Sequence, residues 1–318
     1  MRDGPAIRTI FRPNLRITAQ KTGTGRNSRR DLLGIVQRHP GEAGIVYCRS
    51  RKMVESTATW LQIQGVRAAP YHAGLPDEVR STNQNAFARD EIDVVIATVA
   101  FGMGIDKSNV RFVVHRDMPR SVESWYQEIG RSGRDGLPSD CVVMYSWADV
   151  LGYDHFLSDI EDPEMRDETR RKTIELFDLL ESGACRHRAV VGYFDELIDD
   201  CSESCDICTG EDIAALVPET VRVRKRAAAQ VAADGFDPHT AALDSPEAGL
   251  FERLRALRKR LADAEQVPAY IVFNDAVLRQ MVDVRPRTND ELLALSGVGP
   301  AKLRRYGAAF LTEIASEA

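Results

Sequence analysis

The sequence has no apolar run long enough to span a membrane, and its first residues, MRDGPAIRTIFRPN, lack the apolar stretch of a signal peptide. We therefore expect a cytoplasmic protein, associated with the nucleoid if the source is a bacterium. An excess of positive charge is also lacking, because 42 Lys and Arg stand against 48 Asp and Glu, a formal net charge of −6. This balance argues against a protein that is basic all over its surface, but it leaves room for a local basic groove.

Cysteine is scarce outside one short segment. Four of the six cysteines follow the spacing C-x15-C-x3-C-x2-C. Four thiolates suit a tetrahedral zinc ion, and such crowding in a cytosolic chain indicates a metal site before disulfides. The predicted ligands of one structural Zn²⁺ are Cys185, Cys201, Cys205 and Cys208. The alternative is four unrelated buried cysteines; Cys48 and Cys141, in apolar runs, are expected in the core.

Residues 1–150 alternate between short apolar runs and helical patterns. The runs predicted to be buried strands are GIVYC (44–48), VVIAT (94–98), VRFVVH (110–115) and CVVMY (141–145). Between the first two, apolar residues recur at helical spacing from Met53 to Leu61, and Gly65 closes that helix. Strands that are apolar throughout and alternate with helices predict an α/β domain with an open parallel sheet.

The rest of the chain is predicted to be helical. Residues 151–210 end in the cysteine cluster, residues 211–244 form a linker with some helix, and residues 245–318 form a compact all-α domain. In that domain Thr288 and Glu291 match a capping box. Gly299, Pro300 and Gly307 are expected at the N-cap, first turn and C′ position of the last helix but one.

The segment PRSVESWYQEIGRSGRDG predicts a helix that begins near Ser121 and places Gln127, Arg131 and Arg134 on one face. Gly130 and Gly133 lie beside them, and a glycine costs a helix about 1 kcal/mol relative to alanine. We therefore expect another backbone or a ligand to approach closely. Two guanidinium groups on one face suit a polyanion, since arginine binds phosphate oxygens bidentately. The alternative is a surface helix held by salt bridges.

A glycine-rich loop thirty residues upstream favours phosphate binding by these arginines over a salt-bridged surface helix. A predicted strand ends at Thr98, and Gly102, Gly104 and Asp106 follow. Ligands in open α/β sheets bind at the carboxyl ends of strands, where exposed loop amides can hold phosphate.

Four segments together resemble the fourth, fifth and sixth motif regions of RecQ helicases, in order. They are YCRSRKMVESTATWL, YHAGL, ATVAFGMGIDKSNVRFVVH and SWYQEIGRSGRDG, and FRPNL (11–15) resembles the start of that family's second RecA-like domain.

The resemblance implies that Arg134 is an arginine finger for ATP on a neighbouring domain, that Arg131 assists at the phosphates, and that Gln127 couples ATP to the domain interface. It also implies that Gly102, Gly104 and Asp106 link nucleotide to DNA, and that Ser50, Arg51 and His72 touch the DNA backbone.

Two further segments resemble the same family. CRHRAVVGYFDE (185–196) is similar to its zinc-bearing helix, although the family usually has two residues, not three, between the second and third cysteines. His187 is expected on the surface. Residues 250–314 resemble the helicase-and-RNase-D C-terminal (HRDC) domain, and the linker leaves no room for the winged-helix domain that usually precedes it.

The HRDC-like segment contains a candidate phosphate site. In GVGPAKLRRYG (297–307), Gly297 and Gly299 bare backbone amides ahead of a helix N-terminus. Lys302, Arg304 and Arg305 add positive charge, and Tyr270 could stack on a base. The equally supported alternative is that the glycines only shape a turn and the charges are solvated.

No GxxxxGK[ST] phosphate loop is found. KTGTGRNS (21–28) comes nearest, but it lacks GK[ST] and follows no apolar strand, so it is interpreted as a polar loop. No DExH-like box follows an apolar run either. We therefore expect ATP and Mg²⁺ to bind only together with a first RecA-like domain supplied in cis or in trans, and the chain alone to be inactive.

The hypothesis is the C-terminal part of an ATP-dependent 3′–5′ DNA helicase of recombination and repair, acting on single-stranded or partly duplex DNA. The alternatives are a complete, non-catalytic DNA-binding or regulatory protein and a zinc-dependent structural adaptor.

Overall fold

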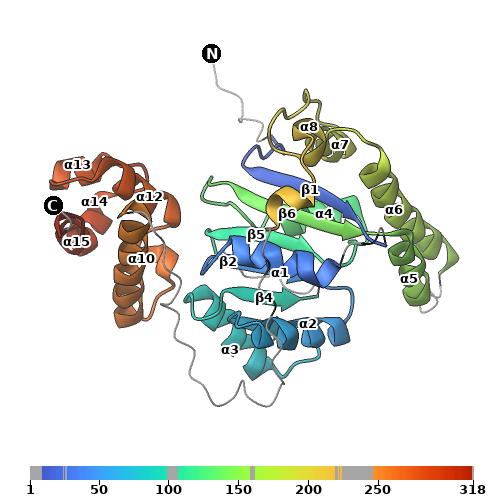
Figure 1. Ribbon diagram of the computed structural model, residues 1–318, viewed down its shortest axis with the longest axis horizontal. Helices are drawn as coiled ribbons and strands as arrows, with labels where there is room; N and C mark the ends of the chain where they lie inside the picture. Colours follow the sequence, from blue (N-terminus) through green and yellow to red (C-terminus); the bar gives the residue numbers. More distant parts are fainter. Residues whose placement is uncertain are drawn as a thin grey trace.

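The computed structural model describes residues 9–23, 25, 27–98, 107–157, 162–218, 221, 223 and 246–316. Its centre is a sheet in the order β1-β6-β5-β2-β4-β3, in which every strand pair is parallel (Figure 1). The strands are β1 Leu15–Lys21, β2 Ala43–Tyr47, β3 Ala68–Tyr71, β4 Val94–Ala97, β5 Val110–His115 and β6 Ser139–Tyr145. The predicted α/β domain with a parallel sheet is therefore confirmed.

The four strands predicted from apolar runs are the four inner strands, and sequence reasoning missed both edges. In β1 a polar residue stands at every second position, and β3 is only Ala-Ala-Pro-Tyr. Pro70 lacks the amide that a central strand needs, so it fits an edge strand. Apolar continuity thus marks only strands that are buried on both faces.

Helices cover both faces of the sheet. The apolar side chains of α1 (Ser28–Arg38), α2 (Arg51–Ile63) and α9 (Ile213–Leu216) pack on one face. Those of α3 (Asp77–Ala88), α4 (Val122–Ile129), α6 (Pro163–Glu181) and α7 (Arg186–Tyr193) join the core on the other. The predicted helix closed by Gly65 is α2, and Gly65 adopts φ +87°. None of the described helices combines the length and apolarity needed to cross a bilayer.

The segment KTGTGRNS connects an edge strand to a helix. It runs from the end of β1 to the start of α1, where the Asn27 side chain accepts the amides of Arg29 and Arg30. The strand before it, β1, was not predicted, because it is an edge strand without a continuous apolar run; the loop thus follows a strand, but not an apolar one. The loop still lacks the lysine of a phosphate-binding loop.

A buried carboxylate lies at the amino-terminal end of β6. The side chain of Asp140 is 0% exposed, and Arg16 and Arg38 approach it to 2.8 and 3.5 Å. His39 bridges two carboxylates, with Nε2 2.8 Å from Asp140 and Nδ1 2.7 Å from Glu42. Burial lowers the pKa of His39, but hydrogen bonds and charge from Asp140 and Glu42 outweigh burial and raise it overall.

The segment after the sheet is helical, as predicted, with α5 (Trp147–Leu157), α6, α7 and α8 (Asp206–Thr209). It closes the edge of β1: the Ile17 amide donates to the Ser204 carbonyl at 2.9 Å, and the Ala19 amide donates to Asp206 at 3.0 Å. An exposed strand edge can pair with another chain, and these contacts cover the free edge of β1. Of the predicted linker, α9 is described, and most of the remainder lies outside the described residues.

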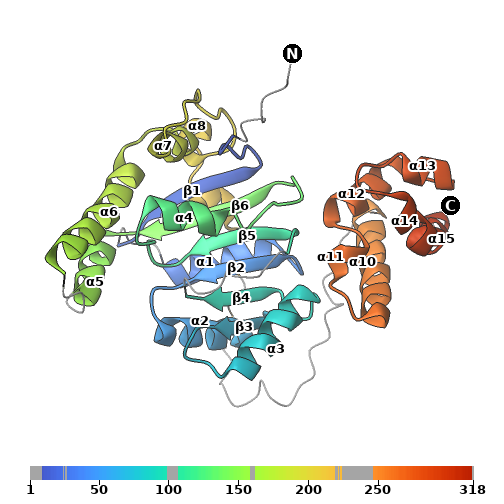
Figure 2. The same cartoon turned by 180° about the vertical axis from the view of Figure 1, so that it is seen from behind.

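The C-terminal module comprises residues 246–316. Its helices are α10 Pro246–Glu265, α11 Ala269–Val272, α12 Asp275–Val284, α13 Asn289–Leu293, α14 Pro300–Lys302 and α15 Ala308–Ala315, around one apolar core. Thr288 caps α13 by accepting the Glu291 amide at 3.2 Å. The Glu291 carboxylate accepts the Arg287 amide at 2.7 Å, one residue before the cap. Figures 1 and 2 place the module beside the amino-terminal ends of the sheet strands, on the opposite side from α5 and α6. We call these strand ends the amino-terminal edge of the sheet.

The prediction that Gly307 ends a helix is wrong. Gly299 is the N-cap of α14 and Pro300 begins it, as expected, but the chain continues through a π-helical turn, Leu303–Gly307, directly into α15. A Cβ on Gly307 would lie 2.8 Å from Leu303 Cδ1. Gly307 therefore lies inside a continuous helical run, with the end of the Leu303 side chain packed against it.

Candidate functional site

Arg131 and Arg134 lie in a turn after α4, not on its face. Ser121 starts α4 as predicted, since its Oγ accepts the Ser124 amide at 3.2 Å. The helix ends at Ile129, and Gly133 adopts the left-handed φ of +57°. The prediction of one helix carrying Gln127, Arg131 and Arg134 at helical spacing is therefore wrong beyond Ile129. We call residues 130–137 the arginine turn.

The arginine turn is held by groups far away in the sequence. The Gly133 amide donates to the Val110 carbonyl at 3.0 Å, and its carbonyl accepts from Arg12 at 2.8 Å and from Asn14 at 2.9 Å. Asn14 also donates to the Leu137 carbonyl at 3.0 Å. The close approach that the glycines led us to expect is made at Gly133, by the Asn14 side chain and the Leu137 carbonyl.

A buried ion pair fixes the second half of the turn. Nη2 of Arg111 donates to both carboxylate oxygens of Asp135 at 2.6 Å each, and the two side chains are 3% and 0% exposed. Charge-assisted bonds of this kind hold geometry tightly when both partners are desolvated. The turn is therefore positioned before any ligand arrives.

The three candidate side chains differ in exposure. Gln127 and Arg134 are exposed, and Arg131 is half-buried. Burial and the charge of Glu128 raise the pKa of Tyr47, while the charges of Arg131 and Arg134 oppose that rise. Because Arg134 is exposed, it can meet a group outside this domain.

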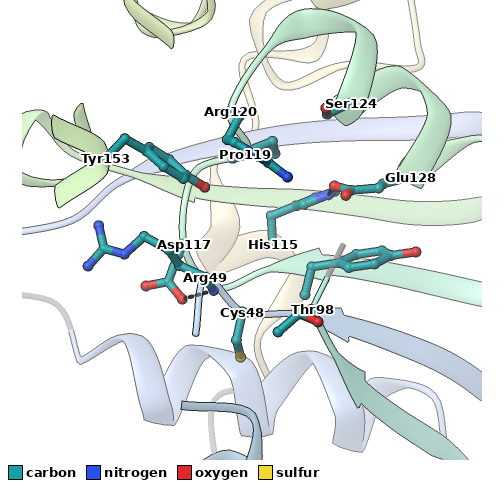
Figure 3. A pocket seen from close by; sticks show the side chains of 11 residues that line it. Cys48, Arg49, Thr98, His115, Asp117, Pro119, Arg120, Ser124, Glu128 and Tyr153 are labelled. Atoms are coloured by element: carbon teal, nitrogen blue, oxygen red, sulfur yellow. Dashed lines mark hydrogen bonds and ion pairs between the residues drawn. The ribbon is translucent and has the colours of Figure 1, made fainter. Parts of the chain in front are cut away.

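A cavity of about 340 Å³ opens at the carboxyl ends of β2, β4 and β5 (Figure 3). Its polar lining includes Tyr47, Arg49, His115, Asp117, Arg120 and Glu128. His115 Nε2 lies 2.7 Å from a Glu128 oxygen, and its ring stacks on Tyr47 with centroids 5.1 Å apart. The Arg49 amide donates to Asp117 at 3.0 Å, the bond drawn dashed in Figure 3.

Sequence reasoning missed these cavity residues. The one available signal was position: His115 ends a predicted strand, Tyr47 is the last residue but one of another, and the ends of parallel strands form ligand sites. Glu128 follows Gln127 on α4, so this helix joins the cavity to the arginine turn. Gly102, Gly104 and Asp106, the predicted nucleotide-coupling residues, lie outside the described residues.

The three predicted DNA-contact residues of the α/β domain are placed unequally. Ser50 caps α2 just after β2 and accepts the Met53 amide at 3.3 Å, and Arg51 is exposed and lies over Gly74. A helix N-terminus beside an arginine suits a phosphate. His72 is only 2% exposed and faces Glu55 at 3.2 Å, so its side chain is not presented to a ligand in this structure.

The four predicted zinc ligands converge. Their sulfur atoms all lie within 4.8 Å of one another, with Cys185 and Cys205 3.9 Å apart, and all four thiols are free. Zn–S bonds of about 2.3 Å in a tetrahedron place sulfurs about 3.8 Å apart. The backbone amides of Arg188 and Cys201, working against burial, lower the pKa of Cys185. The donor set therefore fits one Zn²⁺.

The unusual spacing does not disturb the cluster. Within the three residues between Cys201 and Cys205, Ser202 adopts a left-handed φ of +63°, and the sulfurs still meet. The expectation for His187 is wrong: it is 3% exposed, and its Nε2 lies 2.9 Å from the Leu15 carbonyl. It ties the zinc-binding segment to the edge of the sheet and is not a surface residue.

In the C-terminal module the predicted phosphate site is partly assembled. Gly297 has φ +92°, and Gly299 begins the helical run that carries Lys302 and Arg305. Arg305 is 63% exposed and pairs with Glu265 at 2.7 Å, a partner that sequence reasoning missed. Burial lowers the pKa of Lys302, whose ammonium lies 5.5 Å from the centre of the Phe273 ring.

The predicted DNA contacts of the module and of the α/β domain do not form one surface. Tyr270 lies half-buried on α11, three residues before Phe273, whose ring the Lys302 ammonium approaches. The module itself stands at the amino-terminal edge of the sheet (Figures 1 and 2), whereas Ser50 follows the carboxyl end of β2. The structure thus keeps the two predicted DNA-contact groups on different sides of the domain.

Three family models match the chain in succession. They are the helicase conserved C-terminal domain over residues 27–136, the RecQ zinc-binding domain over 147–209 and the HRDC domain over 247–314. The chain belongs to the RecQ family and corresponds to the C-terminal part of RecQ proteins. The boundaries predicted at residues 150, 210 and 244 stay predictions.

The similar RecQ proteins are longer than this chain. ATP-dependent DNA helicase RecQ of Haemophilus influenzae is 31% identical over 401 residues, an alignment that covers 97% of this chain and 64% of that protein. The RecQ protein of Pasteurella multocida is 33% identical, covering 96% and 62%, and that of Bacillus subtilis is 32% identical, covering 92% and 63%. The chain therefore spans less than two thirds of these relatives.

The structure contains three separate candidate sites. The arginine turn presents positive charge from a backbone held by buried contacts, the four cysteines can hold a structural metal, and α2 with Arg51 offers a phosphate contact. Gln127, on the same helix as the cavity residue Glu128, lies between the strand ends and the arginine turn.

Proposed function

We propose that this chain supplies an arginine finger and DNA-binding surfaces to an ATP-dependent 3′–5′ DNA helicase of recombination and repair. The supporting observation is the arginine turn, where the exposed Arg134 projects from a loop held by the buried pair of Arg111 and Asp135. An arginine that stabilises charge on a transferring phosphoryl group must be placed before the reaction, because reorganisation in the transition state costs rate.

ATP and Mg²⁺ then belong to a first RecA-like domain, joined in cis or supplied in trans. Arg134 acts on the phosphoryl group, Arg131 assists at the phosphates, and Gln127 transmits the nucleotide state through α4 toward Glu128 and the strand ends. Residues 1–318 alone hydrolyse no ATP and unwind no DNA in this proposal. Zinc has a structural role, since it fixes the segment that covers β1.

DNA, single-stranded or partly duplex, binds through its phosphates. In the α/β domain the contacts are the N-terminus of α2 with Ser50 and Arg51, and His72 holds the neighbouring turn by accepting the Gly74 amide at 3.2 Å. The protein works in the cytoplasm, at the nucleoid if the cell is bacterial.

The test reconstitutes the enzyme and removes one guanidinium. A RecA-like domain with a complete phosphate loop is fused ahead of residue 1 or added in trans, and DNA-stimulated ATP hydrolysis is measured. Arg134→Ala should lower turnover about 10³- to 10⁵-fold while nucleotide affinity is largely kept, because the finger acts in the transition state.

The matched control is Arg171→Ala, a surface arginine on α6 that is 63% exposed and pairs with Glu175. Reconstituted activity that is indifferent to Arg134→Ala would remove the finger role. ATP hydrolysis by the chain alone would overturn the division of labour, and a chain that binds DNA but never yields activity would favour the non-catalytic alternative.

A further inference from the structure

The C-terminal module meets the α/β domain through basic side chains of α10 and α12. Arg255 Nη2 donates to the Gly41 carbonyl at 2.6 Å, and Lys259 Nζ donates to the Arg89 carbonyl at 2.9 Å. These acceptors precede β2 and β4, so they lie at the amino-terminal edge of the sheet. Both contacts give a hydrogen-bond donor to a backbone carbonyl that lies outside the strand pairing of the sheet.

A second basic contact comes from α12. Arg279 Nη2 lies 3.4 Å from a carboxylate oxygen of Glu42, and its guanidinium also stacks over the Phe251 ring at 4.7 Å. Glu42 is the residue whose other carboxylate oxygen pairs with His39. The acidic partner is thus already oriented within its own domain before the module arrives.

The centre of the contact is a buried network of charges. Arg258 is 1% exposed, with Nη1 2.7 Å from Asp275 of its own module and Nη2 3.5 Å from Asp90 of the α/β domain. On its other side Asp90 pairs with Lys107, whose side chain is 1% exposed. Buried charges persist only when paired, and removal of one partner leaves the others uncompensated. The network therefore joins the two domains.

The backbone at Asp90 supports this reading. Asp90 has φ +60°, the left-handed region, directly after α3. Glycine would adopt this conformation without cost, but it would bring no carboxylate, and aspartate is one of the few other residues that enter it routinely. Burial alone would raise the pKa of Asp90; Lys107, Arg258 and Arg255 together lower it below its ordinary range, so the group is charged.

We propose that the basic face of α10 and α12 is an intramolecular docking surface whose partner is the amino-terminal edge of the sheet in the same chain. Four cations form this face, namely Arg255, Arg258, Lys259 and Arg279. Docking covers Arg255 and Arg258, whose side chains are 14% and 1% exposed, while Lys259 and Arg279 contact the α/β domain and stay 37% and 49% exposed. The run with Lys302 and Arg305 stays open. The covalent connection raises the effective concentration of the two partners. The inference does not depend on the proposed helicase function.

The test measures how often the interface opens. In the full chain, carbodiimide-mediated labelling of carboxylates is followed by mass spectrometry at Asp90, with Asp77, whose side chain is 90% exposed, as the internal standard. We expect Asp90 to label far more slowly than Asp77. Lys259→Glu and, separately, Arg279→Glu should each speed labelling of Asp90 about tenfold or more, because each replaces a charge-assisted bond by repulsion.

The matched control is Arg260→Glu, the same charge change on the same helix at an exposed position outside the docking face. It should leave labelling of Asp90 unchanged. Pairing Arg279→Glu with Glu42→Lys should restore protection, since the charges are exchanged across the same contact. Labelling of Asp90 at the rate of Asp77 in the unaltered chain, or equal effects of Arg260→Glu and Lys259→Glu, would overturn the docking surface.

Discussion

Replacement of Gly133 by alanine tests whether the arginine turn is as tightly built as its contacts indicate. Gly133 has φ +57°, and a Cβ there would lie 2.4 Å from Asn14 Nδ2 and 2.9 Å from the Leu137 carbonyl oxygen. Neither neighbour can give way cheaply. Asn14 holds the turn through two hydrogen bonds, and the Leu137 oxygen belongs to the backbone.

The cost has two parts. An alanine in the left-handed region costs roughly 1–2 kcal/mol. Displacement of Asn14 loses two hydrogen bonds of about 0.5–1.5 kcal/mol each. Gly133→Ala should therefore lower the free energy of unfolding of the α/β domain by about 2–5 kcal/mol. Equilibrium urea denaturation, followed by the fluorescence of the buried Trp125 on α4 and the other tryptophans, measures it.

Gly136→Ala separates the two parts. Gly136 also has a left-handed φ, +84°, but no atom lies within 4 Å of its ideal Cβ position. This variant should show only the backbone cost, about 1–2 kcal/mol. Equal losses for Gly133→Ala and Gly136→Ala would refute the claim that Asn14 and Leu137 lock the turn. In the reconstituted enzyme only Gly133→Ala should also reduce ATP turnover, since it displaces the arginines.

Three other perturbations address the metal, the DNA and the pH dependence. Cys205→Ser should lower bound zinc from about one ion per chain and destabilise the segment over β1, as metal analysis and thermal denaturation would show. The control Cys48→Ala, outside the cluster, should leave the zinc content intact. An unaltered zinc content in Cys205→Ser would contradict the predicted ligand set. Lys302→Ala with Arg305→Ala should weaken single-strand binding and reduce the salt slope by up to about 1.4, or about 0.7 per phosphate contact; an unchanged slope would leave this run as a packing element. Because the pKa of His39 is raised in the folded state above its ordinary value of 6.5, the stability it contributes is complete below pH 6.5 and is lost as the pH rises through the folded value. Denaturation midpoints from pH 5.5 to about 9 should therefore decline in the native chain and lose this component in His39→Gln; parallel curves would show that the bridge carries no net stability.

Much of the fold was predictable because its signals are local or fully buried. Every position of β2, β4, β5 and β6 is buried, and each strand contains an apolar run, as expected for strands in the centre of a parallel sheet. The cysteine cluster was predictable because four thiol ligands lie within 24 residues of one another in the sequence, Cys185 to Cys208. The edges β1 and β3 were missed because their stability comes from the neighbours that cover them, which no local pattern records.

The arginine turn shows where periodicity stops being informative. Counting by helical spacing from Gln127 reaches Arg131 and Arg134, yet the helix ends at Ile129. What ends it is a left-handed glycine whose carbonyl is claimed by Arg12 and Asn14, about 120 residues earlier in the chain.

The two glycines beside the arginines also differ in meaning. At Gly133 an added Cβ would collide with groups 2.4–3.0 Å away, whereas at Gly130 the nearest is the ordinary helical carbonyl of Tyr126 at 3.1 Å. The sequence marks both positions alike. Only the partner from the start of β1 distinguishes the glycine that sets the arginines in place, and this is why Gly133, more than Gly130, should govern their geometry.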